Sequence, residues 1–524
     1  MKKKAWWPII AAAVVLFSLL WVAGCGTRKA EKEIVYTVAD DTGDWGFPSP
    51  YGHYPRGPGY VRMSFVFDTL IWKDARGFVP ALAKEWKYDP QEKAYVFWLE
   101  KNATWHDGQP FTAKDVVFTV EYTRQHPYQW VDTSVIQKAE AIDDYTVKFT
   151  LRQPYAPFLS DVAGALPILP AHIWQKVTEP EKFQDKEAAV GTGPFKLVDY
   201  NREQGTYLFE AYDKYYQGRP KVQKLQFVKM SEEMAGAALK KKQVNATSIQ
   251  PEIAETLRQE GFQVLSGTHD WVAKLMINHN KEPLSRREFR QALAWGIDRK
   301  QLVEVALRGY GLTGSPGLIP PDSPWYDSAV EPYEYNPVKA QELLAALGYT
   351  RQGNYLAKEG RVLELELLFK GGGSLTDQRA AELIKEQLER IGIKVNLQSL
   401  DAKTLDSRVK EWKFDLALSG HGGLGGDPRI LNRTTLEQNI NSARYDKSPE
   451  LNGVLVQQLG EMEPAKRREL VNKAQELYAR EMPALPLYYP TSYWAHDGLV
   501  DLYYTWGGVG SGVPIPLNKL SWVK

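Results

Sequence analysis

The chain has 524 residues, with 65 lysines and arginines against 64 aspartates and glutamates, so its formal charge is +1, and it contains a single cysteine. A near-neutral chain offers no strongly basic surface for nucleic acid, and one cysteine excludes an internal disulfide framework. This length is enough to bury a large hydrophobic core, and we expect two or three domains.

The start of the chain has the pattern of a secretory signal. Three lysines at positions 2–4 precede an apolar run at 5–22, which is short for a stable membrane span. The small residues Ala23 and Gly24 stand directly before Cys25. This ending is similar to a bacterial lipobox, in which the cysteine receives a diacylglycerol and becomes the new N-terminus. A retained N-terminal anchor is the alternative, and in both cases the remaining chain lies outside the cytoplasmic membrane.

A polar stretch follows the cysteine. Residues 26–33 read Gly-Thr-Arg-Lys-Ala-Glu-Lys-Glu and show no apolar period, so we expect a flexible tether. Removal of the signal takes away three lysines and changes the formal charge from +1 to −2. Lipid on Cys25 would also leave no thiol for disulfides, redox chemistry or metal binding.

Alternation and capping predict the first elements. Apolar and polar residues alternate at 95–99 and at 146–151, which indicates two half-buried strands. Between them, Thr112 followed by Asp115 is typical of a capped helix start.

The segment before that helix contains a histidine and an aspartate. His106, Asp107 and Gly108 are most simply a turn, in which the glycine takes a positive φ. An acid–base pair of His106 and Asp107 is the alternative, but no nucleophile accompanies it.

Helices and strands alternate through the second half of the chain. We expect a helix at 290–299, a second one capped by Asp298 that stops at Gly309, and a third from Asn336 to Gly348. Beyond them, a strand at 362–369, an apolar helical stripe at 380–391 and a strand at 393–397 predict a right-handed crossover with parallel strands. A further strand at 414–418 leads into a glycine-rich loop. The fold class that results is mixed α/β.

Four segments carry motifs that stand in a fixed order. They are Ala-Leu-Ala-Lys-Glu-Trp at 81–86 with Trp-His-Asp-Gly-Gln-Pro-Phe-Thr-Ala-Lys-Asp-Val at 105–116, Gly-Thr-Gly-Pro-Phe-Lys-Leu at 191–197, Arg-Gln-Ala-Leu-Ala-Trp-Gly-Ile-Asp-Arg at 290–299, and Pro-Leu-Tyr-Tyr at 486–489. Together they resemble the large extracellular solute-binding proteins of the peptide and nickel ABC uptake systems, often called family 5. The glycines and the proline at 191–194 read as a backbone bend before a strand, not as a phosphate cradle.

The resemblance implies a two-lobed fold of the periplasmic-binding-protein type (class II, large), in which the lobes close on a ligand. On this pattern the chain divides into a signal peptide at 1–24, a lipidated tether at 25–33, a first lobe at 34–270 with an inserted subdomain at about 69–190, a second lobe at 271–491, and a return to the first lobe at 492–524. The candidate hinge strands are 274–278 and 488–491.

The glycine-rich loop at 420–426 precedes Asp427 and Pro428. Several glycines in a row let a backbone approach something closely, and loops after strands are where open α/β sheets place ligands. In peptide-binding relatives an aspartate at a comparable Asp-Pro step meets the ligand's α-ammonium group, so the resemblance implies this role for Asp427. The alternative is an ordinary helix start, with Asp before Pro as cap and first turn.

Two more residues of this region are candidate ligand contacts. Arg429 stands near the place where nickel-binding relatives carry a histidine, and an arginine pairs with carboxylates but cannot ligate a metal. His421 is the remaining histidine of the loop, and it is either a ligand contact or solvated and hydrogen-bonded. Trp45, in the loop after the first strand, is a further candidate for the cleft, and packing of that loop is its alternative.

The leading hypothesis is a lipid-anchored receptor that binds a peptide or a similar small solute and delivers it to the permease subunits of an ABC importer. A receptor for a metal chelate such as nickel, or for an oligosaccharide, is an alternative within the same fold. A solute sensor and an extracellular hydrolase are alternatives of other classes, although only the pattern at Ser407 to Lys410 favours a hydrolase. We predict a monomer with no cofactor, no metal ligands and no catalytic residues.

Overall fold

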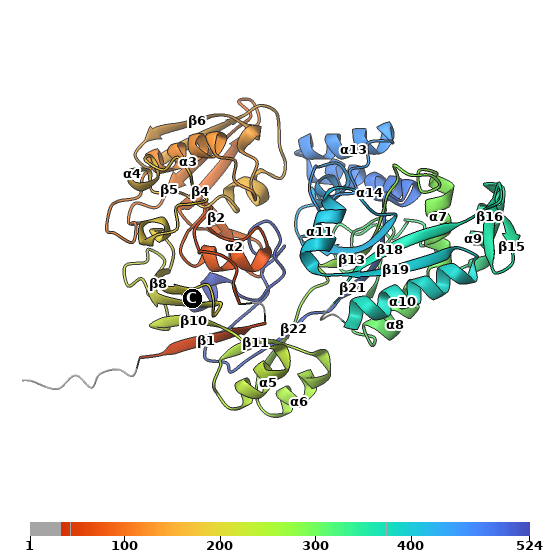
Figure 1. The fold of residues 1–524 in the computed structure, drawn as a ribbon. Coiled ribbons are helices and arrows are strands. Elements are labelled where there is room, and N and C mark those ends of the chain that lie inside the picture. Colours follow the sequence, from red (N-terminus) through yellow and green to blue (C-terminus); the bar gives the residue numbers. More distant parts are fainter. Residues whose placement is uncertain (1–32, 42, 372–374, 524) are drawn as a thin grey trace, which may run out of the picture.

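The computed structural model describes residues 33–41, 43–371 and 375–523. The expected signal peptide at 1–24, the lipid site at Cys25 and the tether up to residue 32 lie outside these ranges. Within them we find no helix with the length and apolar character needed to span a bilayer. The mixed α/β, two-lobed fold is confirmed, because two large sheets lie on separate sides of the molecule in Figure 1.

A seven-stranded mixed sheet forms the first lobe. Its strands in spatial order are β12 (Gln263–Ser266), β22 (Tyr493–His496), β11 (Ala246–Ile249), β1 (Val35–Asp40), β10 (Lys224–Lys229), β9 (Thr206–Ala211) and β8 (Phe195–Asn201). The helices of this lobe are α2 (Gly57–Ser64), α5 (Glu232–Lys240) and α6 (Ala254–Gln259). Strand β1 has parallel partners on both sides, whereas the other neighbours in the sheet pair antiparallel.

A four-stranded antiparallel sheet is inserted into this lobe. Its strands in spatial order are β4 (Ala83–Asp89), β5 (Ala94–Leu99), β7 (Thr146–Leu151) and β6 (Ile136–Asp143), with the hairpin β2 (Ile71–Lys73) and β3 (Phe78–Pro80) ahead of it and the helices α3 (Ala113–Gln125) and α4 (Ala171–Trp174) beside it. The strands expected at 95–99 and 146–151 are confirmed. The helix start is confirmed too, because the Thr112 N–H donates to Asp115 Oδ2 at 2.9 Å within a capping box.

A six-stranded sheet forms the second lobe. Its strands in spatial order are β14 (Gly311–Thr313), β21 (Ala484–Pro490), β13 (Val272–Ile277), β20 (Leu416–His421), β18 (Glu364–Lys370) and β19 (Lys394–Leu400). The helices of this lobe are α7 (Arg287–Gly296), α8 (Arg299–Ala306), α9 (Pro337–Ala346), α10 (Leu375–Arg390), α11 (Ala402–Lys410), α12 (Ile430–Thr435), α13 (Pro449–Gly460) and α14 (Pro464–Glu481). A small sheet of β15 (Thr350–Gln352), β16 (Tyr355–Lys358) and β17 (Arg361–Val362) lies at its edge (Figure 1).

The parallel pairing expected of the crossover in this lobe is confirmed. Strands β18 and β19 pair in parallel, and α10 connects them. The strand expected at 362–369 is split at Leu363, because β17 belongs to the small sheet while β18 belongs to the large one. The helix caps are also as expected, with Asp298 and Asn336 each accepting a backbone N–H three residues later at 3.0 Å.

The chain passes between the two sheets twice, at 267–271 and at 491–492. His269 ties the two crossings together, since its Nδ1 lies 2.8 Å from Asp322 Oδ2 and its Nε2 lies 2.8 Å from the Thr491 hydroxyl. The first crossing precedes the expected hinge strand at 274–278, which lies inside the second-lobe sheet as part of the fully buried β13. The expected hinge at 488–491 leads directly into the second crossing.

The C-terminal segment after β22 returns to the first-lobe core. Lys519 and Asp68 form an ion pair whose two side chains are both 0% exposed. The Lys519 ammonium also lies 4.1 Å from the centre of the Trp72 ring. Because such a pair is costly to bury unless both charges are matched, it fixes the C-terminal segment against the start of the inserted subdomain.

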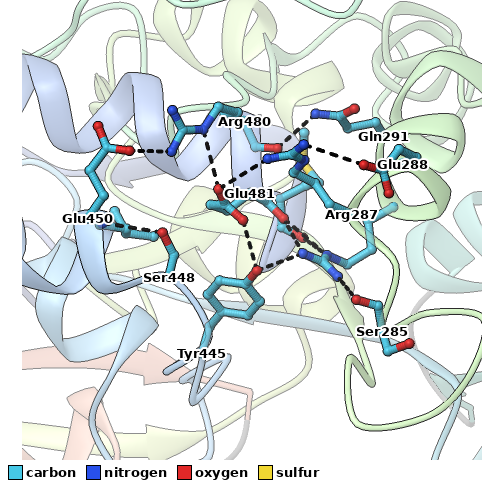
Figure 2. Close-up of polar contacts among 12 residues, drawn as sticks. Ser285, Arg287, Glu288, Gln291, Tyr445, Ser448, Glu450, Arg480 and Glu481 are labelled. Atoms are coloured by element: carbon cyan, nitrogen blue, oxygen red, sulfur yellow. Dashed lines mark hydrogen bonds and ion pairs between the residues drawn. The ribbon is translucent and has the colours of Figure 1, made fainter.

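Arg290, the first residue of the motif at 290–299, is buried and has a structural role. Figure 2 shows the polar network that joins α7, α14 and the loop before α13. The Arg290 guanidinium donates to Glu481 O at 2.6 Å, to Ser285 O at 2.8 Å and to the Tyr445 hydroxyl at 2.8 Å. The Tyr445 hydroxyl in turn donates to Glu481 Oε2 at 3.0 Å. Arg290 therefore satisfies carbonyl groups at the C-terminal end of α14, just before β21 leads to the second crossing.

One neutral histidine connects the first two family motifs. The Gly191 N–H donates to His106 Nδ1 at 3.2 Å, and His106 Nε2–H donates to Gly193 O at 2.9 Å. Burial lowers the pKa of His106 to about 4, so the imidazole is uncharged at pH 7. Both ring nitrogens are engaged with backbone, which matches the structural interpretation of this turn and leaves neither nitrogen for acid–base chemistry.

Gly191 is required by close packing of two backbones. A Cβ at this position would lie 2.0 Å from Val66 O, far inside van der Waals contact. In α13, by contrast, a Cβ at Gly453 would meet nothing within 4 Å.

We predict that Gly191→Ala destabilises the protein by about 3 kcal/mol, because the backbone of 65–67 must move to admit the methyl group. The matched control Gly453→Ala should raise stability by up to about 1 kcal/mol, since it only removes a glycine from a helix interior. Thermal melts followed by circular dichroism would measure both. Equal melting midpoints for Gly191→Ala and the wild type would contradict the assigned role.

Candidate functional site

A cavity lies between the two lobes. The empty space among its lining residues is about 620 Å³ with open solvent included, and about 40 Å³ of it can hold the centre of a water-sized sphere. Its charged lining residues are Lys73, Asp132, Asp161, Asp427, Arg429 and Arg433, and its aromatic ones are Trp130, Tyr155 and Trp506. Because the inserted subdomain, the second lobe and the C-terminal return all contribute walls, the cavity exists only when the two lobes meet.

Two glycine-rich loops pack against each other beside this cavity. A Cβ on Gly507 would lie 2.8 Å from Gly426 Cα, and a Cβ on Gly512 would lie 2.5 Å from Gly423 Cα. The close approach expected of the loop at 420–426 is therefore met by the backbone of 507–512, from the other lobe. That second segment reads Trp-Gly-Gly-Val-Gly-Ser-Gly at 506–512. Its glycine content is a sequence signal for this wall of the cavity that the motif analysis did not use.

Asp427 lines the cavity and is already paired. Its carboxylate accepts from Arg467 through both oxygens, at 2.7 Å and 2.5 Å, and Oδ1 also accepts the Arg429 N–H at 2.9 Å. The side chains of Arg467 and Asp427 are 8% and 16% exposed. Since each carboxylate oxygen has two lone pairs, Oδ2 keeps one acceptor position for another group.

Arg429 makes a contact between the lobes. Its Nε lies 2.6 Å from Asp161 Oδ2 on the inserted subdomain, and its second terminal nitrogen lies 2.9 Å from Glu437 Oε1. The Tyr155 hydroxyl donates to the same Asp161 oxygen at 2.8 Å. Burial alone would lower the pKa of the Arg429 guanidinium, but Asp161, Tyr155 and Glu437 together outweigh it and hold that pKa above its usual range. This ion pair holds the lobes together at the cavity wall.

His421 is buried behind the cavity rather than in its lining. Its Nδ1 lies 2.9 Å from Gly422 O, and its Nε2 has no partner among the described residues. Burial lowers the pKa of His421 well below its ordinary value, and the nearby Lys274 ammonium adds to this effect. Positive charge at this place also opposes a metal cation. Among the described residues, no cluster of three or more His, Cys, Asp or Glu side chains could hold a metal ion.

Trp45 lies elsewhere in the first lobe. Its backbone N–H donates to the Tyr207 hydroxyl at 2.7 Å, and its ring centre is 6.5 Å from that of Tyr54. It is not among the residues that line the cavity. Its role as a ligand contact stays a prediction, as do those of Asp427, Arg429 and His421.

Several cavity residues have no local signal in the sequence. Lys73 on β2 is 3% exposed and donates to Gly510 O at 2.8 Å and to Gly507 O at 3.3 Å. Burial lowers its pKa to about 8. Asp161 and Arg433 likewise stand in segments without a motif, and only the fold brings the three together.

The Asp427–Arg467 pair predicts a stability effect. Replacing Asp427 by Ala leaves the buried guanidinium without its carboxylate, so we expect a loss of about 3 kcal/mol. The double variant Asp427→Ala/Arg467→Met should recover part of that loss, since it also removes the unmatched charge. Thermal melts of the two single variants and the double variant measure this coupling. Additive losses in the double variant would show that the pair is not coupled.

Comparison with known proteins places the chain in a family. The family model described as "Bacterial extracellular solute-binding proteins, family 5 Middle" matches residues 77–442. The chain is 27% identical to heme-binding protein A of Haemophilus influenzae over 93% of this chain and 94% of that one. It is 26% identical to the dipeptide-binding protein of Escherichia coli over 79% of this chain and 81% of that one.

The fold is shared with solved structures. The crystal structure of NikZ from Campylobacter jejuni in complex with Ni(L-His) matches with a TM-score of 0.80 and 22% identity, over 94% of this chain and 99% of that one. The family model covers well over half of the chain. The chain therefore belongs to the bacterial extracellular solute-binding proteins of family 5.

Proposed function

We propose that this protein is the lipid-anchored solute-binding component of an ABC importer, and that it captures a peptide or a similar small solute between its lobes for delivery to the permease. The observation that carries the proposal is the cavity itself, whose charged walls come from both lobes. A solute bound there contacts both lobes at once, so binding favours the closed arrangement. Membership of family 5 supports the proposal.

The cavity suits a solute that carries charge as well as apolar surface. Carboxylates and cations face it together with indole and phenol rings, so ligand charges removed from water would find partners. In the proposed role of Asp427, the free acceptor position on Oδ2 receives the α-ammonium group of a peptide. Arg467 then holds the carboxylate in place through two hydrogen bonds.

The N-terminal sequence supports a receptor held at a membrane. We propose that residues 1–24 are removed, that Cys25 carries the lipid, and that residues 25–33 form the tether. Nine residues span at most about 30 Å when fully extended, which keeps the lobes close to the permease. We propose the lobe boundaries implied by the resemblance, 34–270 with 492–524 and 271–491, and the crossings at 267–271 and 491–492 support this proposal. We further propose that the protein acts as a monomer.

The proposal predicts that peptides bind and leave unchanged. Residues 26–524 would be screened by native mass spectrometry and thermal shift against peptides of two to five residues, nickel with histidine, haem and short glycans. A ligand at a hundredfold excess over its Kd stabilises by about 2.7 kcal/mol, so a true ligand raises the melting midpoint measurably. Binding of nickel–histidine, haem or a glycan without any peptide would overturn the peptide assignment. Chemical conversion of a bound compound would overturn the receptor assignment.

The role of Asp427 predicts selectivity for a free N-terminus. Asp427→Asn should weaken binding of peptides with a free amino group roughly tenfold or more, because an ionised acceptor becomes neutral. Binding of the N-acetylated peptides should change little. Comparing the two peptide forms on one variant cancels any general loss of stability. Equal losses for both forms would show that Asp427 serves only the Arg467 pair and the helix start.

A further inference from the structure

Arg433 presents an unused guanidinium to the cavity. It lies on α12 (Ile430–Thr435), whose other residues are buried, and its side chain lines the cavity wall. The contacts that the described residues make with it involve its backbone, since its N–H donates to Arg429 O at 3.0 Å and its carbonyl accepts from Asn439 Nδ2 at 2.8 Å. No described residue forms a hydrogen bond or an ion pair with the guanidinium.

The surroundings of Arg433 make this arrangement costly without a ligand. Arg429 stands one helical turn earlier and takes both nearby carboxylates, Asp161 and Glu437. Burial lowers the pKa of Arg433 and the neighbouring Arg429 lowers it further, while the Asp161 and Glu437 carboxylates offset only part of this effect. Like charges four residues apart on a helix repel, and a charge drawn out of water needs a counter-charge. A further anion would therefore be a favourable partner for this guanidinium.

Lys73, on the first-lobe side of the cavity, is a second cation with an N–H donor that has no acceptor among the described residues. The Lys73 ammonium has three N–H donors and two carbonyl acceptors, Gly507 and Gly510. Asp132, the remaining acidic residue of the lining, is exposed and accepts an N–H from its own turn at Ser134. Asp161 and Asp427 line the same space, so a group with two negative charges would meet more repulsion there than a singly charged one.

We propose that Arg433 and Lys73 form an anion subsite, and that the captured solute carries a carboxylate bound by these two cations from opposite lobes. The planar guanidinium donates two parallel hydrogen bonds to such a group. The carboxylate then bridges the lobes beside the Arg429–Asp161 pair and favours closure. This assignment rests on the proposed function, and it adds the chemical class that the site selects.

The test compares free acids with amides. Residues 26–524 of the wild type, Arg433→Gln and Arg433→Lys would be incubated with a random pentapeptide pool carrying either a free carboxylate or an amide at the C-terminus. The wild type should prefer the free acid roughly tenfold or more, Arg433→Gln should lose most of this preference, and Arg433→Lys should keep part of it. Arg390→Gln, at the exposed end of α10, is the matched control and should bind as the wild type does.

A second readout separates a binding role from a structural one. Without ligand, Arg433→Gln should melt at or above the wild-type midpoint, because it breaks no hydrogen bond or ion pair, and because the burial of the charge and its repulsion from Arg429 outweigh its attraction to Asp161 and Glu437. A clear loss of unliganded stability would overturn the proposal, since it would mean that Arg433 supports the fold.

Titrations with small anions distinguish failure of the anion subsite from failure of the proposed receptor function. Succinate and glutarate would be compared with inorganic phosphate in thermal-shift titrations of the wild type and Arg433→Gln. Peptide binding without preference for the free acid would overturn the subsite and leave the receptor function intact. Stabilisation by dicarboxylates that depends on Arg433, without peptide binding, would support the subsite and overturn the peptide assignment. Neither response, or stabilisation by phosphate alone, would overturn the carboxylate subsite.

Discussion

The double crossing between the two sheets is the constraint on which the site depends. Both crossings are short, and each joins a strand of one sheet to a strand of the other. The lobes can therefore move as bodies only through a few backbone dihedral angles in these segments, while every cavity residue stays fixed to its own lobe. His269 contacts Thr491 and so couples the two crossings. Closure thus brings a defined set of side chains together, whatever solute lies between them.

Charge matching across this closure shapes the cavity. Arg429 and Asp161 meet from different lobes, and the glycine loops at 422–426 and 507–512 pack without side chains between them. Contacts of this kind allow the walls to exclude water, which strengthens the remaining electrostatic interactions. In the same wall, Asp427 is held by Arg467, whereas the Arg433 guanidinium forms no ion pair with the described residues. A site that keeps one charge unmatched gives up stability for affinity.

Local chemistry made much of the fold predictable. The caps at Thr112, Asp298 and Asn336 depend on residues three positions apart, and the parallel crossover follows from periodicity, so the structure confirms them. The two lobes were implied by the family motifs. These motifs proved to be structural, as the contacts of His106 and Arg290 show.

The site was less predictable because its partners are distant in sequence. Asp427 and Arg429 could be predicted as candidates because they follow the glycine-rich loop. Their ion-pair partners, Arg467 and Asp161, stand in segments without a motif. Loop composition alone also cannot tell which aromatic rings face a cavity. Trp506 lines it, while the Trp45 ring lies beside that of Tyr54 in the first lobe. The second glycine segment at 506–512 is the one signal in the sequence that would have located the opposing wall.

The central claim, that the lobes close on a dissolved solute, can be measured as a distance. Residues 26–524 contain no cysteine, so spin labels can be placed at Ile142→Cys on β6 and Val456→Cys on α13, two positions that are each 58% exposed. Pulsed electron–electron double resonance would record the distribution of distances between the two labels, with and without a pentapeptide pool. The account predicts that the distribution shifts to shorter distances and narrows when peptide binds. An unchanged distribution, while binding is detected in the same sample, would contradict it.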